Sequence, residues 1–334
     1  MFDLAEAVAR SPRTLVVPLM GFPGATLTQT SLRDNLFDAE THASSILALA
    51  NAHHPDMVFP MMDLAVEAGA LGVYVDFPEN DSPTVIEHSV RRVSDLARFR
   101  DADILTHPRL VSFLETLRHL RKALDIPVAA YVTGPFTLAG LLIGAKQIAE
   151  ATIEDPTLPL KTLDLTTQII SSYAAACVDA GADLIAYLEP MAVMLSPDSF
   201  EQFSGVFVSR ILSQLDVPGV LHICGDSTHL IPNMCSTGVQ GLSLDAVVSL
   251  AALRKIVPSD IVLMGNIDPV SPMAVGSVED VWSDVTRLRR EMEGARNFVL
   301  STGCDLPLDT PQANIAAFMD AGRAPIKSHA EGRH

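Results

Sequence analysis

Short, nearly continuous apolar runs recur along this chain and alternate with longer segments of helical spacing. From residue 127 onward most of the runs contain few polar positions, which is typical of parallel strands covered on both faces. Two further runs of this kind occur in the N-terminal third. The runs that we predict as strands are 14–20, 57–62, 127–134, 183–190, 219–225, 241–245, 261–267 and 298–303.

Helix signals separate these runs. A helix is expected at 39–51, a second begins after Ser196, and a third begins near Ser277, with acids in its first turn and arginines in its last. Alternating strands and helices indicate parallel βαβ units. Eight such strands suit a closed (β/α)8 barrel better than an open, doubly wound sheet, and no strand is followed by a GxGxxG turn.

We therefore expect an α/β protein with one domain over residues 1–325, a (β/α)8 TIM barrel with an N-terminal extension. Segment 73–100 has no obvious place in the barrel and is interpreted as an excursion from it. Residues 326–334 are expected to be a disordered polar tail, so the histidines within it are excluded from any site.

Composition narrows the class of protein. Hydrophobic residues make up 48% of the 334 residues, enough for a large core. No apolar run reaches the ~18 residues of a membrane span, and no signal peptide is recognisable, so we expect a cytoplasmic protein without membrane contact. The net charge of −17 argues against nucleic acid as a partner. Four cysteines indicate a reducing compartment rather than a disulfide framework. A homodimer is compatible with the sequence.

Cysteine and histidine meet at the predicted strand ends. His222 and Cys224 lie two apart at the end of one strand, so both side chains point to the same face. Cys304 follows the last strand, and its loop must reach inward to join them. In a parallel barrel the carboxyl ends of the strands form the active-site mouth. Two cysteines and one histidine are a catalytic type of zinc set, with one coordination position open.

Four other polar residues end neighbouring strands. Asp245 is either a fourth zinc ligand or the N-cap of the helix that follows it. Glu189 is predicted to be an acid beside the ligands or a proton acceptor. Asn266 and Asp268 are predicted to orient a bound substrate or cofactor, the alternative being turn residues.

The expected chemistry is activation of a thiol. Two thiolates and a neutral imidazole nearly cancel the charge of Zn²⁺, so a third thiolate from a substrate can enter the open position. Zinc lowers the pKa of such a thiol from about 8.5 to below neutrality. Sulfur-rich ligation makes the metal a poor activator of water, which argues against a hydrolase.

Four motifs carry a resemblance to a known family: YVTGPFTLAG from residue 131, LHICG around His222, GNIDP from residue 265 and STGCDLPLDTP around Cys304. Together they resemble the uroporphyrinogen decarboxylase superfamily, and within it the corrinoid-protein:coenzyme M methyltransferases. The resemblance implies zinc bound by His222, Cys224 and Cys304, with Asp245 as an exchangeable fourth ligand. It also implies methyl transfer from methylcob(III)amide, a cobalamin-type cofactor on a partner corrinoid protein, to a small thiol.

Several alternatives stay open. The methyl or alkyl donor could be a folate or an epoxide, and the acceptor a thiol other than coenzyme M. A non-catalytic zinc-binding barrel would have a closed site with Asp245 permanently bound. The decarboxylases of the superfamily carry an arginine-rich N-terminal stretch, which residues 16–30 of this chain lack. A decarboxylase is therefore the less favoured alternative.

Overall fold

The computed structural model describes residues 2–100 and 102–325, and the predicted tail at 326–334 lies outside them. Within the described residues, seven parallel strands form one curled sheet in the order β1-β9-β8-β7-β6-β5-β4. Their bounds are β1 Leu15–Val16, β4 Ala129–Thr133, β5 Leu184–Leu188, β6 Gly219–Ile223, β7 Gly241–Leu244, β8 Val262–Ile267 and β9 Phe298–Thr302. Each of them coincides with a predicted strand.

The eighth predicted strand, at 57–62, closes the barrel between β4 and β1. Val58 pairs in parallel with Val128, and the Ala129 N–H donates to the Val58 carbonyl at 2.9 Å. On the other side the Asp56 N–H donates to the Val16 carbonyl at 3.1 Å. The segment has too few ladder bonds to be a regular strand, but it joins both edges. The predicted (β/α)8 barrel is thereby confirmed.

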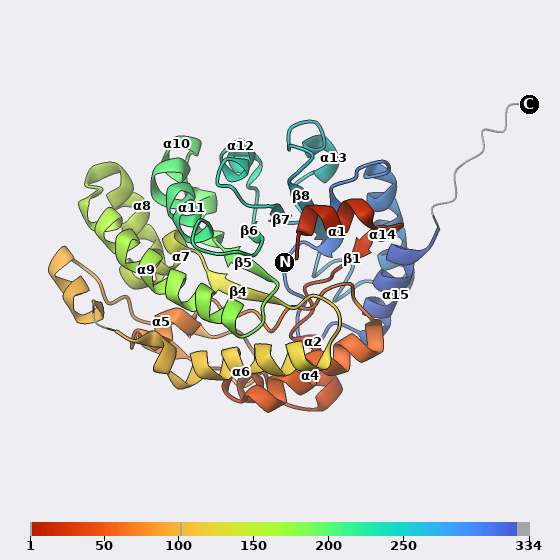
Figure 1. Cartoon of the computed structure of the whole chain (residues 1–334), viewed down its shortest axis with the longest axis horizontal. Coiled ribbons are helices and arrows are strands. Elements are labelled where there is room, and N and C mark those ends of the chain that lie inside the picture. The colour runs from red at the N-terminus through yellow and green to blue at the C-terminus, as the bar shows by residue number, and fades with distance from the viewer. Residues whose placement is uncertain (1, 101, 326–334) are drawn as a thin grey trace, which may run out of the picture.

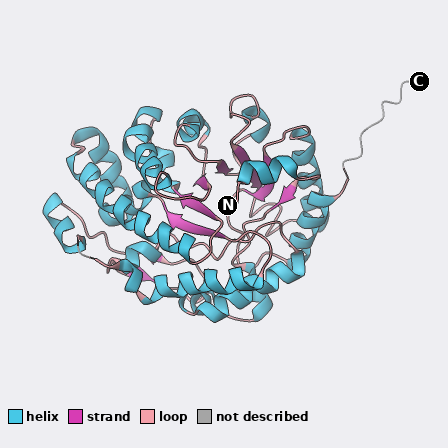
Figure 2. Cartoon of the chain, viewed as in Figure 1, coloured by secondary structure: helices cyan, strands magenta, loops and turns pink. Residues whose placement is uncertain are grey.

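Helices enclose the strands, as Figure 2 shows in cyan around magenta. The α-helices are α1 Leu4–Arg10, α2 Pro23–Thr28, α3 Leu32–Phe37, α4 Ala39–His53, α5 Val66–Ala70, α6 Pro108–Ala123, α7 Pro135–Ile143, α8 Ala145–Glu154, α9 Thr157–Asp179, α10 Pro197–Phe200, α11 Val206–Leu212, α12 Ile231–Cys235, α13 Leu250–Leu253, α14 Val278–Glu291 and α15 Gln312–Arg323. Further helical turns of 3₁₀ or π type cover Val93–Phe99, Ile104–Thr106, Pro190–Met194, Glu201–Gly205 and Thr228–Leu230.

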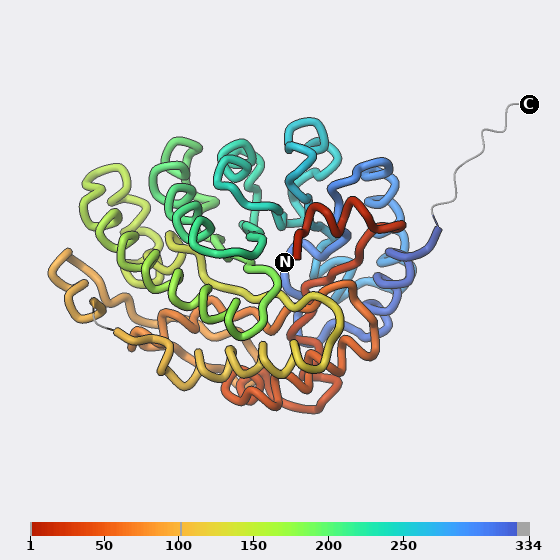
Figure 3. Tube along the Cα trace, viewed as in Figure 1, coloured from red at the N-terminus to blue at the C-terminus, as the bar shows by residue number. Residues whose placement is uncertain are grey.

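The predicted helix starts are found where their capping residues stand. The Ser196 hydroxyl accepts the Ser199 N–H ahead of α10, and Ser277 forms a capping box with Asp280 at the start of α14. Serine oxygens satisfy amide groups that have no partner inside the first turn of a helix. The N- and C-terminal parts of the chain meet where β1 pairs with β9, visible as red beside blue in Figure 3.

The N-terminal extension is α1, drawn in red in front of the strands in Figure 1. Its Leu4 and Val8 belong to the buried cluster that fills the barrel interior together with Val220 and Val262. Leu4 also lies against Gly241, the first residue of β7, where an added Cβ would come 3.1 Å from the leucine. The helix therefore closes the amino end of the barrel and leaves the carboxyl end as the mouth.

Segment 73–100 stands outside the barrel sheet. It forms a two-stranded antiparallel pair, β2 Val75–Asp76 with β3 Thr84–Val85, followed by the turn Val93–Phe99. Among the described residues, no single helix combines the length and apolarity of a bilayer span. The pair α7 and α8 reaches that length and composition only when taken together, across a bend of 105°.

Candidate metal centre

Three predicted ligands converge at the mouth of the barrel. The His222 Nε2 atom lies 3.0 Å from the Cys224 sulfur and 3.8 Å from the Cys304 sulfur, and the two sulfurs are 3.6 Å apart. His222 is buried and both cysteines are half-buried. Residues 80 positions apart in the chain are thus brought to one point.

Local structure explains why each of the three side chains points into the mouth of the barrel. His222 is on β6, and strand alternation turns it and Cys224 to the interior. Cys304 depends on Gly303, whose N–H donates to the Ile267 carbonyl at 2.8 Å. A Cβ on Gly303 would lie 2.6 Å from the Ala246 nitrogen, so only glycine allows the loop after β9 to approach β7 this closely. This close approach turns the Cys304 sulfur inward.

The orientation of His222 is fixed from behind. Its Nδ1 atom lies 3.0 Å from the Ser243 hydroxyl on β7, in the register where the two residues are neighbours. Metal-binding histidines usually engage their second ring nitrogen in this way, which sets the ring orientation and leaves the first nitrogen to the metal. Sequence reasoning missed Ser243, although it stands two residues before Asp245 and must share its face of the strand.

The two cysteine sulfurs are linked by a hydrogen bond that changes the pKa of both. The hydrogen bond between the two sulfurs lowers the pKa of Cys304 to about 4 and raises the pKa of Cys224 above its usual range. Burial adds to the rise at Cys224, while the nearby His222 ring also favours the Cys304 thiolate. A bound dication would favour the thiolate form of both cysteines, since a metal binds the deprotonated sulfur.

The geometry of the three ligands fits a zinc ion. Zinc bonds of about 2.3 Å to sulfur and 2.0 Å to nitrogen, arranged tetrahedrally, separate two sulfurs by about 3.8 Å and nitrogen from sulfur by about 3.5 Å. Two of the three separations lie close to these values, and the His222 to Cys224 separation is shorter. A small shift of one side chain would complete three corners of a tetrahedron with the fourth open.

Asp245 stands at the edge of this set. Its Oδ2 atom accepts the Gly225 N–H at 2.8 Å and its Oδ1 atom accepts the Val247 N–H at 3.2 Å. The helix-cap alternative is wrong, because α13 begins at Leu250 and its cap is Ser249. Asp245 instead ties the loop after β6 to the loop after β7, close enough for its charge to act on Cys224.

Glu189 is used by the chain itself. Its carboxylate accepts the N–H groups of Phe136 and Thr137 at 2.8 Å each and the Ser204 hydroxyl at 3.1 Å. It therefore caps the N-terminus of α7, where an added Cβ on Gly134 would collide with it at 2.1 Å. Burial raises its pKa to about 6 against these hydrogen bonds. A role in cofactor binding stays a prediction.

Asn266 and Asp268 also serve the loops. The Asn266 amide donates to the carbonyls of Asp245 and Val248 at 2.8 and 2.6 Å and holds the loop after β7. Asp268 accepts the N–H groups of Val270 and Ser271, which makes it a turn residue. Neither joins the three ligands, and their predicted contact with a substrate or cofactor is untested.

Two further residues near the sulfurs escaped the sequence reasoning. Asp305 follows Cys304 and accepts the N–H groups of Gly21 and Met62 at 3.2 and 3.4 Å. Burial and then the Cys304 charge hold its pKa well above its usual range. Tyr131 enters from β4 with a buried hydroxyl. Its inward direction follows from alternation, but nothing local marks it as part of a site.

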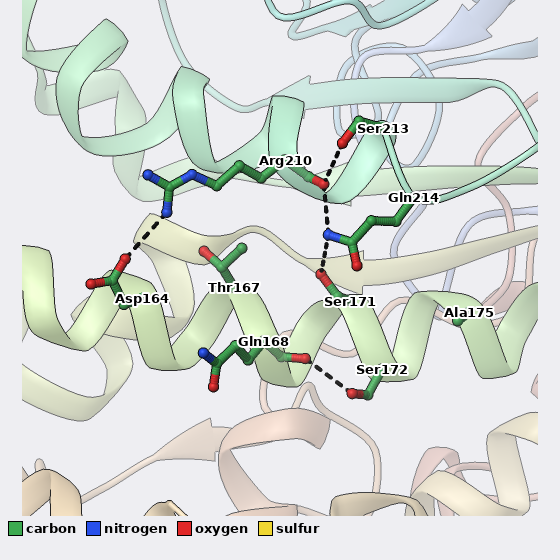
Figure 4. Close-up of a pocket in the computed structure, with 9 residues that line it drawn as sticks. All are labelled: Asp164, Thr167, Gln168, Ser171, Ser172, Ala175, Arg210, Ser213 and Gln214. Carbon is green, nitrogen blue, oxygen red and sulfur yellow. Dashed lines mark hydrogen bonds and ion pairs between the residues drawn. The ribbon is translucent and has the colours of Figure 1, made fainter.

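One surface cavity lies on the helical outer layer, away from the three predicted ligands. It has a volume of about 810 Å³ and lies between α9 and α11 (Figure 4). Its polar groups satisfy one another: Arg210 donates to Asp164 at 3.2 Å, and Gln214 donates to Ser171 at 3.4 Å. It opens on the helical outer layer, near the turn that precedes β6, so size alone does not mark the functional site.

The fold is a (β/α)8 barrel, and His222, Cys224 and Cys304 form a thiol-rich candidate metal site at its mouth. A family profile for uroporphyrinogen decarboxylase (URO-D) matches residues 5–324. The chain therefore belongs to the uroporphyrinogen decarboxylase family, and the resemblance seen in its motifs is confirmed.

Named relatives refine this membership. The methylcobamide:CoM methyltransferase MtaA of Methanosarcina barkeri is 30% identical over 264 residues, covering 77% of this chain and 76% of the relative. A solved methyltransferase from Methanosarcina mazei superposes with a TM-score of 0.87 at 25% identity, over 96% of this chain and 98% of that one. A uroporphyrinogen decarboxylase of Prochlorococcus marinus is 26% identical over 82% of this chain and 80% of its own length. The chain is an enzyme of the methyltransferase class, as the sequence predicted.

Proposed function

We propose that this enzyme transfers a methyl group from a methylcobamide on a corrinoid protein to a small thiol bound to zinc. The observation that carries the proposal is the set formed by His222, Cys224 and Cys304, whose ligand atoms all lie within 4.8 Å of one another. The two thiolates and one imidazole are the donor set of a catalytic zinc with one free position. The methylcobamide:CoM methyltransferase named among the relatives supports this donor and makes coenzyme M the first acceptor to test.

Each residue of the site has a separate role in the proposed activation of the thiol. Bound zinc would lower the pKa of the entering thiol, so that its sulfur is present as thiolate at neutral pH. Cys224 and Cys304 balance the charge of the dication, which keeps the bound sulfur electron-rich. Ser243 holds the imidazole of His222 in position through Nδ1. The sulfur then attacks the methyl carbon, the carbon–cobalt bond breaks, and its electron pair stays on cobalt, which changes from cobalt(III) to cobalt(I).

Asp245 is proposed as the exchangeable fourth ligand. Its carboxylate accepts the N–H of Gly225, the residue after Cys224, and lies outside the group of ligand atoms within 4.8 Å of one another, so it would have to rotate to reach the metal. When a thiol enters, the carboxylate would return to its two backbone donors. Glu189, Asn266 and Asp268 would act less directly, since their polar groups hold α7 and the mouth loops in position. A site of reduced cysteines fits a cytoplasmic location.

The direct test combines metal analysis with a spectroscopic assay. The zinc content of the purified chain is measured, and the zinc form is mixed with methylcobalamin and with coenzyme M or homocysteine. About one zinc per chain and loss of the methylcobalamin spectrum with one of the thiols are expected. Zinc without demethylation by either thiol would exclude the proposed donor and acceptor pair. A chain that binds no zinc would overturn the proposal.

Replacing Asp245 separates the catalytic site from a closed structural one. In Asp245→Ala we expect about one zinc per chain and thiol binding at least as tight as in the parent, because the competing ligand is gone. Asp245→Asn is the matched control, since the amide oxygen can still accept from Gly225. Complete loss of zinc in Asp245→Ala would identify a permanent fourth ligand and overturn the exchangeable role.

A further inference from the structure

Tyr131 carries a buried hydroxyl that the fold itself does not use. The residue lies on β4, is 8% exposed, and stacks its ring on Phe59 with centroids 4.9 Å apart and an interplanar angle of 26°. Within residues 2–100 and 102–325 its hydroxyl has no hydrogen-bond partner. A buried hydroxyl without a partner costs free energy, and in native proteins it usually marks a place where water or a ligand binds.

The surroundings of this hydroxyl are those of the metal centre. Burial, followed by the charges of Asp305, Cys304 and Cys224, holds the pKa of Tyr131 well above its usual range. The phenol is therefore protonated at neutral pH and acts as a donor there. It belongs to the same interior cluster as Val220, which precedes His222 by two residues on the inner face of β6.

The strand order shows from which side Tyr131 approaches. His222 and Cys224 come from β6, and Cys304 comes from the loop after β9. Around the barrel, β7 and β8 lie between these strands on one side, and β5, β4, the segment 57–62 and β1 lie on the other. Asp245 follows β7 and therefore lies on the side of β7 and β8, whereas Tyr131 extends from β4 on the opposite side.

We propose that the Tyr131 hydroxyl donates a hydrogen bond to the sulfur of the substrate thiolate at the open coordination position. This inference rests on the proposed function, because it needs a thiol at the metal. Stacking on Phe59 fixes the ring, so little entropy is lost when the bond forms. A hydrogen bond to an anionic acceptor is stronger than one between neutral groups, and it favours thiolate over a neutral ligand such as water.

The matched pair of variants is Tyr131→Phe and Tyr187→Phe. Tyr187 is also buried, on the neighbouring β5, and its hydroxyl likewise has no partner in the described chain. It belongs to the other cluster, between strands and helices, and does not face the interior. Both substitutions remove one unpartnered oxygen without changing the shape of the ring, so zinc content and Tm should stay close to those of the parent.

Coenzyme M and homocysteine are titrated calorimetrically into the zinc forms. Tyr131→Phe should bind the accepted thiol about tenfold more weakly, whereas Tyr187→Phe should bind it like the parent. In turnover, KM should rise while kcat does not fall, because a sulfur without this hydrogen bond is more nucleophilic. In the cobalt(II)-substituted proteins, the sulfur-to-cobalt charge-transfer band of the thiol complex should move to longer wavelength only in Tyr131→Phe.

The outcomes separate the two proposals. Equal thiol affinity and an unchanged band in Tyr131→Phe, with a parent enzyme that binds thiol, would overturn the role of Tyr131 and leave the proposed function standing. Equal weakening in both variants would assign the effect to general packing and also overturn it. A zinc-loaded parent that binds neither thiol would overturn both proposals together.

Discussion

Two buried polar clusters lie at neighbouring strand ends and differ in how their polar atoms are satisfied. After β5, the Glu189 carboxylate accepts hydrogen bonds from Phe136, Thr137 and Ser204. At the end of β6 and beyond β9, the Cys224 and Cys304 sulfurs and His222 Nε2 have mainly one another as partners. The first cluster is complete and serves the fold. The second needs an additional atom, which is the property of a ligand site.

The largest effect is expected when the incomplete cluster loses a ligand. In Cys304→Ser, zinc content should fall to a small fraction and methyl transfer should fall by more than about a hundredfold, since even residues behind a metal ligand change affinity tenfold or more. The thermal unfolding midpoint of the metal-free protein should change little. Cys235→Ser, which alters another half-buried free thiol, is the control and should keep zinc and activity. Full activity of a zinc-free Cys304→Ser enzyme would contradict the metal assignment.

Substitution of Glu189, in the complete cluster, should lower the stability of the fold rather than the zinc content. Glu189→Ala leaves two N–H groups and one hydroxyl without an acceptor inside the protein, so the free energy of unfolding should fall by about 3 kcal/mol. Urea denaturation measures this loss. The variant should still bind about one zinc per chain at a temperature where it is folded. Loss of zinc from the folded variant, without loss of stability, would place Glu189 in the metal site. The two clusters would then no longer differ in function.

Titration offers a third test of the same contrast. The pKa of Glu189 is raised from 4.5 to about 6, chiefly by burial. In the unfolded chain this carboxyl ionises at a lower pH than in the folded protein. The protonated carboxyl therefore stabilises the folded protein fully below pH 4.5, and this stabilisation is lost as pH rises through about 6. The free energy of unfolding should therefore fall by about 2 kcal/mol across this window relative to Glu189→Gln. Denaturant curves of both proteins at a series of pH values measure the difference, and parallel pH profiles would refute it.

The smallest effect concerns the support behind His222. Ser243→Ala removes the partner of Nδ1 and should weaken zinc binding about tenfold, with little change in stability. Competition with a zinc-binding dye gives the affinity. Ser243→Thr keeps a hydroxyl and is the control that should recover most of it. An unchanged zinc affinity in Ser243→Ala would mean that packing alone orients the ring.

Much of the fold could be predicted because its signals are local. Apolar runs give the strands, and the serine caps at Ser196 and Ser277 give helix starts that the structure reproduces. The segment 57–62 was predicted as a strand like the others, yet it forms a single bridge to Val128. Its apolar pattern specifies burial at the barrel wall, whereas regular pairing depends on the backbone of both neighbours.

The candidate site could be predicted only where residue chemistry is rare. A histidine and a cysteine two apart at a strand end point to a metal, but a carboxylate at a strand end does not reveal its partner. Glu189 and Asp245 looked equivalent in the sequence. The first is buried against the start of α7, and the second joins the loops after β6 and β7.

By itself, the sequence determined the alternation of strands and helices and the closed barrel, and it singled out three candidate ligands, because each depends on local periodicity or on scarce side chains. Only the tertiary structure decided which groups surround those ligands. The inward path of Cys304 depends on the contact of Gly303 with Ala246, and Ser243 reaches His222 through the register of β6 and β7. Such contacts depend on packing between segments far apart in the chain, which no local pattern specifies.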